Sequence, residues 1–124
     1  MNILVVDDST AMRKIIINTL GKTELKGAKV TEAATGKEGL DKFLSGNYAL
    51  ILSDWNMPEM DGLEFITKVR RADTRVKIIM ITTEGTVGKL DSAMESGVDE
   101  YVVKPFTAEV LERKIRKVMG RSAA

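Results

Sequence analysis

The sequence contains neither cysteine nor histidine. Without cysteine, the chain can form no disulfide bond and no thiolate metal site. Without histidine, it lacks the commonest general base and the usual ligand of transition metals. Its chemistry must therefore use carboxylates, hydroxyl groups, lysines or the backbone.

An excess of charge of one sign and long hydrophobic runs are missing too. The 19 basic and 18 acidic side chains leave a net charge of +1, which argues against a protein built to bind nucleic acid through its phosphates. No apolar run approaches the roughly 20 residues of a membrane span. The N-terminus also shows no basic region followed by an apolar stretch. We therefore expect a cytoplasmic protein with neither a nucleic-acid nor a membrane partner.

The 124 residues, 44% of them hydrophobic, predict one globular domain. Short apolar runs alternate with amphipathic stretches along the chain. Four runs are apolar without alternation, as in strands buried on both faces, and a weaker fifth run is typical of an edge strand. The four runs are 3–6, 49–52, 78–81 and 101–103, and the edge strand is 29–32.

Apolar residues at helical spacing predict a helix after each run. Asp61 and Thr107 are expected to begin the third and fifth helices, and Gly97 is expected to end the fourth. Alternating strands and helices predict an α/β protein, a doubly wound parallel sheet with helices on both faces. The apolar stripes are Met12, Ile15, Ile16, Thr19 and Leu20; Leu40, Phe43 and Leu44; Leu63, Ile66 and Val69; Leu90, Ala93 and Met94; and Leu111, Ile115, Val118 and Met119.

Polar residues follow the buried runs, at the point where each predicted strand ends. Asp7 and Asp8 follow the first run, Asp54 the third, Thr82 the fourth and Lys104 the fifth. Ligands of open α/β sheets bind beyond the carboxyl ends of the strands. Three carboxylates suit a hard cation such as Mg²⁺, whereas a hydroxyl and an ammonium group suit phosphoryl oxygens.

The pair of acids at the end of the first run has two interpretations when it is considered alone. Asp7, Asp8 and Ser9 could cap a helix that begins near Ser9. The two acids could instead hold a cation, because adjacent carboxylates repel each other unless a positive charge lies between them. The recurrence of polar groups at the same end of separate strands favours the cation.

Four motifs, in order and with fitting spacing, carry a resemblance to a known family from end to end. They are LVVDDS, LILSDWNMPEMDGLE, IIMITTEG and YVVKPF. The chain resembles the receiver domain of bacterial two-component response regulators, and among these the single-domain, CheY-like chemotaxis regulators. The resemblance, rather than the spacing, implies a flavodoxin-like sheet of five strands in the order 2-1-3-4-5. It also implies a receiver domain over residues 1–120, with 121–124 as a short tail and no output domain attached.

The resemblance further implies a role for each site residue. Asp54 would be the phosphoacceptor, and Mg²⁺ would be bound by Asp8, by Asp54, by the backbone carbonyl of Asn56 and, through an oriented water, by Asp7. The implied phosphoryl contacts are Thr82, Thr83 and Lys104, the switch pair is Thr82 and Tyr101, and the peptide between Lys104 and Pro105 is expected to be cis.

The resemblance implies a phosphorylation-driven binding switch rather than an enzyme with a separate substrate. A sensor histidine kinase would donate the phosphoryl group, and a flagellar motor switch protein would bind the phosphorylated form. A phosphatase is a further possible partner, and the chain is expected to be monomeric. The alternative is a phosphorelay intermediate that passes the phosphoryl group to another histidine-containing protein.

Two other functional classes fit less well. Hydrolases of the haloacid-dehalogenase type carry a second Asp two residues after the nucleophile, where this chain has Asn56. A flavodoxin-like cofactor binder would need a phosphate loop after the first strand, where Asp7 and Asp8 would repel phosphate. The chain also departs in small ways from the family it resembles: Thr83 stands where many members carry Ala, and Gly85 and Gly88 loosen the expected start of the fourth helix.

Overall fold

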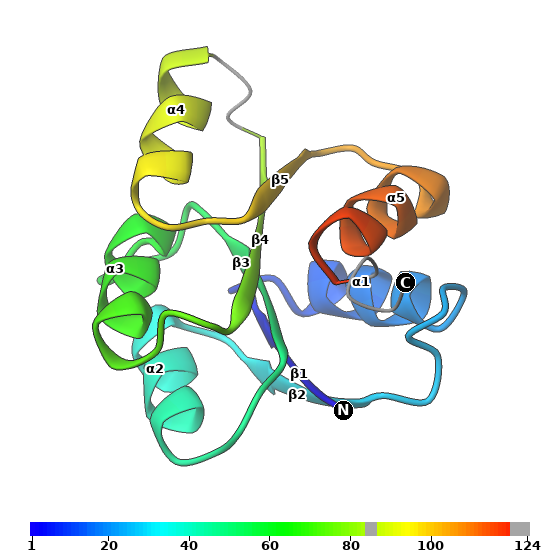
Figure 1. Cartoon of the computed structure of the whole chain (residues 1–124), viewed down its shortest axis with the longest axis horizontal. Helices are drawn as coiled ribbons and strands as arrows, with labels where there is room; N and C mark the ends of the chain where they lie inside the picture. Colours follow the sequence, from blue (N-terminus) through cyan, green and yellow to red (C-terminus); the bar gives the residue numbers. More distant parts are fainter. Residues whose placement is uncertain (84–86, 120–124) are drawn as a thin grey trace.

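The structure is a computed structural model that describes residues 1–83 and 87–119 (Figure 1). Within these residues, strands and helices alternate regularly, as the sequence predicts. Most strands extend one or two residues beyond the apolar run that marks them. The elements are β1 Asn2–Val6, α1 Thr10–Leu20, β2 Lys29–Ala33, α2 Gly36–Leu44, β3 Leu50–Asp54, α3 Gly62–Ala72, β4 Lys77–Thr82, α4 Val87–Glu95, β5 Glu100–Val103 and α5 Ala108–Met119.

The strands form one parallel sheet in the order β2-β1-β3-β4-β5. This order confirms the predicted doubly wound α/β fold, with β2 at an edge of the sheet. The winding reverses between β1 and β3, which are neighbours in space although β2 separates them in sequence. Because all strands run in the same direction, their carboxyl ends meet along one rim, where such folds bind ligands.

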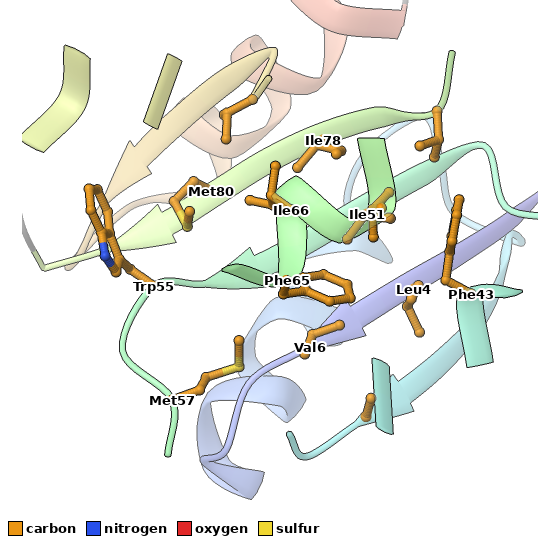
Figure 2. Close-up of a cluster of buried hydrophobic side chains, with 14 of the residues drawn as sticks. Leu4, Val6, Phe43, Ile51, Trp55, Met57, Phe65, Ile66, Ile78 and Met80 are labelled. Atoms are coloured by element: carbon orange, nitrogen blue, oxygen red, sulfur yellow. The ribbon is translucent and has the colours of Figure 1, made fainter. Parts of the chain in front are cut away.

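The sheet is covered by helices on both faces (Figure 1). One apolar cluster packs α2 and α3 against one face and extends to Ala93 of α4, while the other packs α1 and α5 against the opposite face. Alternate residues of β1 divide between the clusters: Leu4 and Val6 belong to the first, and Ile3 and Val5 to the second. Figure 2 shows the first cluster, in which Phe65 of α3 is fully buried.

The predicted apolar stripes are right in their centres and wrong at some margins. Ile16, Phe43 and Ala93 are buried, but Ile15, Leu44 and Met94 are 49%, 59% and 44% exposed. Phe65, outside the stripe predicted for α3, is completely buried. A helix lying on a sheet covers only part of its circumference, so residues at the border of an apolar stripe remain in contact with solvent.

The predicted helix ends are confirmed by their hydrogen bonds. The Asp61 carboxylate accepts a hydrogen bond from the backbone N–H of Glu64 at 2.9 Å. The Thr107 hydroxyl accepts one from the N–H of Val110 at 3.2 Å. Gly97, just after α4, has a φ of 108°, a left-handed conformation that favours glycine at the end of a helix. Among the helices in the described part of the chain, none combines the length and the apolar character needed to cross a membrane.

Candidate functional site

Three carboxylates meet at the carboxyl end of the sheet, as the sequence predicts. Asp7 and Asp8 directly follow β1, and Asp54 is the last residue of β3. The pairing of Val6 with Ser53 makes these strand ends neighbours. One carboxylate oxygen from each acid lies within 4.8 Å of the others, with Asp7 and Asp54 buried and Asp8 exposed.

Asp54 lies in an environment that disfavours its charged form. Burial, and next the negative charge of Asp7, raise the pKa of Asp54, while Lys104 and a hydrogen bond from the Trp55 N–H act in the opposite direction. The Lys104 ammonium lies 3.4 Å from Asp54 Oδ1 and 3.4 Å from Asp7 Oδ2. One lysine thus faces two acids, and the third acid adds further negative charge to the site.

Helix capping does not explain this concentration of acids. The Ser9 hydroxyl caps α1 by accepting a hydrogen bond from the N–H of Met12 at 3.1 Å. Asp7 Oδ1 accepts one from the N–H of Ser9 at 2.8 Å, whereas Asp7 Oδ2 faces Lys104. Capping therefore accounts for Ser9 and for one oxygen of Asp7, but not for the convergence of Asp8 and Asp54.

The acidic cluster fits a magnesium ion in its donor chemistry and its dimensions. Mg²⁺ prefers oxygen ligands and keeps several waters when it is bound by one or two carboxylates. One carboxylate oxygen of each acid lies within 4.8 Å of the others, so the three acids are close enough to share one ion, directly or through a bound water. Asn56, two residues after Asp54, is exposed in the following loop.

The other strand-end residues lie on the opposite side of Asp54 from β1. Thr82 is completely buried at the end of β4 and pairs with Val103 of β5. Thr83, the next residue, is exposed. The backbone N–H of Lys104 donates a hydrogen bond to the Thr82 carbonyl at 2.8 Å, and the predicted cis peptide between Lys104 and Pro105 is confirmed.

The loop after β3 folds back tightly onto the strand that carries Asp54. The Gly62 N–H donates a hydrogen bond to the Trp55 carbonyl at 2.7 Å. A Cβ atom at position 62 would lie 2.4 Å from the Asp54 carbonyl oxygen, so only glycine fits there. Within the loop, Glu59 has a φ of 67°, which is unfavourable for a residue with a side chain.

Trp55 and Met57 anchor the loop after β3 in the core. Both side chains are buried at the end of the apolar cluster shown in Figure 2, where Met80 of β4 lies on the same face of the sheet. On its other side, the Trp55 ring has the ammonium of Lys89 in α4 at 5.6 Å from its centroid. Because Trp55 follows Asp54 directly in the sequence and its ring lies beside Lys89 of α4, its fluorescence is a useful reporter of changes at the site.

Tyr101 is half-buried in β5, and its surroundings connect it to α5. The ammonium of Lys114 lies 5.0 Å from the centroid of the Tyr101 ring. The carboxylate of the buried Glu100 forms ion pairs with the ammonium groups of Lys114, at 3.3 Å, and Lys117, at 2.8 Å. Burial opposes ionisation of Glu100, but the hydrogen bonds from Lys117 and the Tyr101 N–H, with the charge of Lys114, lower its pKa.

Basic residues near the end of α5 form ion pairs with other parts of the protein. Lys117 and Arg116 are largely exposed, yet Lys117 pairs with Glu100, and Arg116 pairs with Glu24 at 2.8 Å. Gly85, expected to loosen the start of the fourth helix, and the predicted tail 121–124 lie outside the described residues, as do positions 84, 86 and 120.

Sequence reasoning missed one charged residue that contacts the acidic loop. Arg13 of α1 donates a hydrogen bond from Nη1 to the Asp7 carbonyl at 2.6 Å. The available signal was its position one helical turn after Ser9, which caps the helix beside Asp7. Its main-chain acceptor and its ion-pair partner Glu32, 19 positions further along the chain, are not visible in any local motif.

The family model of the response regulator receiver domain matches residues 3–116 of the chain. The chain belongs to this family and is a receiver domain of the CheY-like type, a phosphoacceptor signalling domain. It is 48% identical to the chemotaxis protein CheY1 of Helicobacter pylori strain J99, over 97% of this chain and 98% of that protein. It is also 46% identical to the chemotaxis protein CheY homolog of Campylobacter jejuni strain 81-176, over 97% of this chain and 93% of the relative.

Solved structures of CheY proteins share the fold. The chain aligns with the chemotaxis response regulator CheY4 of Vibrio cholerae at a TM-score of 0.86 and 35% identity, covering 95% of this chain and 98% of the other. It aligns at a TM-score of 0.88 and 25% identity with a chain of the CheX–CheY–BeF₃–Mg²⁺ complex from Borrelia burgdorferi, covering 95% and 88%. The relatives therefore include a receiver domain crystallised with magnesium and a phosphoryl mimic.

Proposed function

We propose that the chain is a phosphorylation-activated switch in which Asp54 accepts a phosphoryl group from the histidine of a sensor kinase. An Asp54 carboxylate oxygen would attack phosphorus, the bond between phosphorus and the histidine nitrogen would break, and an acyl phosphate would form on Asp54. The observation that carries this proposal is the place of Asp54 between two further acids and Lys104. Positive charge on both sides would stabilise the phosphoryl oxygens during transfer.

The acidic cluster would hold Mg²⁺, which supplies positive charge to the transferring group. Asp8 and Asp54 would ligate it directly, Asp7 would act through a bound water, and the Asn56 carbonyl would complete the protein ligands. Asp7 is suited to the indirect role because one of its oxygens already accepts the Ser9 N–H while the other faces Lys104. Lys104, Thr82 and Thr83 would contact the phosphoryl group.

The phosphorylated site would then change the face formed by α4, β5 and α5. The new charge on Asp54 would attract the Thr82 hydroxyl through a charge-assisted hydrogen bond. Tyr101, on the neighbouring strand, would move from half-buried to buried. The pairing of β4 with β5 supports this route, because Tyr101 lies opposite Met80, two residues before Thr82.

The proposed setting is a cytoplasmic monomer that receives its phosphoryl group from a histidine kinase and binds a flagellar motor switch protein. The chemotaxis names of the relatives support this setting. The Borrelia burgdorferi complex supports a second protein partner for the activated state, and we include a phosphatase among the proposed partners. Transfer of the phosphoryl group to another histidine protein remains the alternative output.

Phosphoryl uptake tests the proposed function. The wild type, incubated with acetyl phosphate and Mg²⁺, should gain one labile phosphoryl group, and chelation of Mg²⁺ should prevent the gain. Asp8→Ala should take up far less, whereas Lys104→Ala should still accept phosphate but fail to convert it into partner binding. Asp41→Asn, which changes an exposed acid of α2, serves as the control. Uptake that persists without Mg²⁺ would contradict the proposed role of the acidic cluster.

A further inference from the structure

One guanidinium group connects the acidic loop to the edge of the sheet. Arg13 Nη1 donates to the Asp7 carbonyl at 2.6 Å, Nε donates to the Glu32 carboxylate at 2.9 Å, and Nη2 lies 3.3 Å from the Thr10 hydroxyl. The Arg13 side chain is only 13% exposed. An arginine with donors used in three directions is held in one orientation, unlike a surface cation that changes rotamer freely.

The acceptor on Asp7 is its backbone carbonyl, not its carboxylate. This carbonyl belongs to the peptide unit that joins Asp7 to Asp8, so Arg13 fixes the plane from which the Asp8 side chain departs. On the other side of the same residue, the Asp7 N–H donates to the Ala33 carbonyl at 3.1 Å. The backbone of Asp7 is therefore held at both its N–H and its carbonyl, even though Asp8 itself is exposed.

The other end of the contact is equally fixed. Glu32 lies in β2 opposite Val5 of β1. Its carbonyl accepts a hydrogen bond from Lys42 at 2.6 Å, and Lys42 pairs with Glu38 of the same helix at 3.1 Å. Arg13 is thus anchored to a strand whose register with β1 is already set.

We propose that Arg13 is a positioning residue for magnesium, which it never touches. The proposal rests on the proposed function, because it assigns Mg²⁺ to the acidic cluster. By holding the peptide between Asp7 and Asp8, Arg13 keeps both carboxylates directed toward Asp54 before the ion arrives. Partners that orient metal ligands in this way typically contribute about 10- to 100-fold to metal affinity.

The sign of the effect separates positioning from simple charge. Arg13 is a cation near a cation site, so Coulomb repulsion alone predicts that removing its charge strengthens Mg²⁺ binding. Positioning predicts the opposite, because a loosened peptide lets the two carboxylates spread apart. A merely structural role would change stability without weakening the affinity of the folded protein for Mg²⁺.

The test is a Mg²⁺ titration of the metal-free chain, followed by calorimetry and by Trp55 fluorescence. Arg13→Met, which keeps the apolar stem, should weaken Mg²⁺ binding about 10-fold or more. Lys14→Met removes the same charge from an exposed site on the same helix and should leave the affinity unchanged or slightly higher. Arg13→Lys should recover part of the affinity, because one ammonium can reach the Asp7 carbonyl without reproducing the planar contact to Glu32.

The proposal would be overturned if the Arg13→Met variant bound Mg²⁺ as tightly as the wild type or more tightly. If Arg13→Met fails to fold, as judged by circular dichroism, the comparison of Arg13→Lys with Lys14→Met decides the question, and equal affinities in these two variants would also overturn it. Failure of the wild type to bind Mg²⁺ would refute the proposed metal site itself and the role of Arg13 with it. If the wild type binds Mg²⁺ and Arg13→Met binds it equally well, only the role of Arg13 is refuted, and the proposed metal site stands.

Discussion

Lys104 lies between two acids at the carboxyl end of the sheet, with its ammonium 3.4 Å from both Asp54 Oδ1 and Asp7 Oδ2. Among the described residues, Lys104 is the cation that pairs with the carboxylates of this three-acid cluster. In the absence of a metal ion, the site is short of positive charge, and the raised pKa of Asp54 follows from burial first and from the charge of Asp7 second. Stability and metal binding are therefore coupled at this point.

Asp54→Asn should stabilise the metal-free protein at neutral pH. A raised pKa means that folded Asp54 keeps its proton to higher pH than unfolded Asp54, so the wild type loses stability as pH rises through that interval. The amide avoids this loss, and its advantage should shrink in acid, where the carboxyl is protonated in both states. Thermal unfolding as a function of pH, without metal, measures the effect; a variant less stable than the wild type at pH 7 would contradict it.

Added Mg²⁺ should stabilise the wild type more than a variant that lacks a proposed ligand of the ion. A ligand that binds only the folded state raises its stability by mass action, by about 2.7 kcal/mol at a concentration 100 times the Kd. Saturating Mg²⁺ should therefore raise the Tm of the wild type and change that of Asp8→Ala much less. Equal increases in the two proteins would show that the ion binds elsewhere.

Glu100→Gln should destabilise the protein in a way that depends on pH. The hydrogen bonds from Lys117 and the Tyr101 N–H lower the pKa of the buried Glu100 against the effect of burial. A lowered pKa contributes stability above the unfolded pKa, and that contribution is lost as pH falls through the folded pKa. The Tm of the variant should be lower than that of the wild type at pH 7 and should converge with it in acid, below the lowered pKa of folded Glu100. If the variant's Tm stays equally far below that of the wild type in acid, the loss of stability comes from altered packing rather than from the charge of Glu100.

Two glycine substitutions should have opposite effects. A Cβ at position 62 would meet the Asp54 carbonyl oxygen at 2.4 Å, so Gly62→Ala should cost about 1–3 kcal/mol or more and disturb Mg²⁺ binding. A Cβ at Gly88, in the first turn of α4, meets nothing within 4 Å. Gly88→Ala should therefore stabilise the protein by about 0.4–1 kcal/mol. Urea unfolding checks both values, and a neutral Gly62→Ala would contradict the tight packing of the loop.

Glu59→Gly should stabilise the loop that follows the phosphoacceptor. Glu59 has a φ of 67°, a conformation that costs a residue with a side chain about 1–2 kcal/mol and glycine almost nothing. Part of this gain is offset by the greater entropy of glycine in the unfolded chain, so we expect about 0.5–1 kcal/mol. Glu64→Gly serves as the comparison: this substitution lies within α3, where glycine is unfavourable, and should destabilise the protein by a similar amount.

The sequence predicts the features that depend on local periodicity and on the geometry of parallel strands. Uniformly apolar runs mark buried strands, and the polar residues after them converge because parallel strands end at one rim. The cis peptide before Pro105 was predicted through family resemblance and is confirmed. Features that depend on tertiary packing were missed. The contact of Arg13 with the Asp7 carbonyl and the burial of Glu100 against α5 arise only when distant segments meet. The exposure of Leu44, the last residue of α2, likewise depends on packing that its local pattern does not show.

The central claim is that Asp54 itself carries the phosphoryl group, and its location can be measured directly. The wild type would be phosphorylated with acetyl phosphate and Mg²⁺, reduced with borohydride to trap the acyl phosphate, digested, and analysed by mass spectrometry. We predict a single reduced residue at position 54, with none in Asp54→Asn. Phosphate found instead on Ser53, Thr82 or Thr83, or trapping at Asp7 or Asp8 in the wild type, would contradict the assignment.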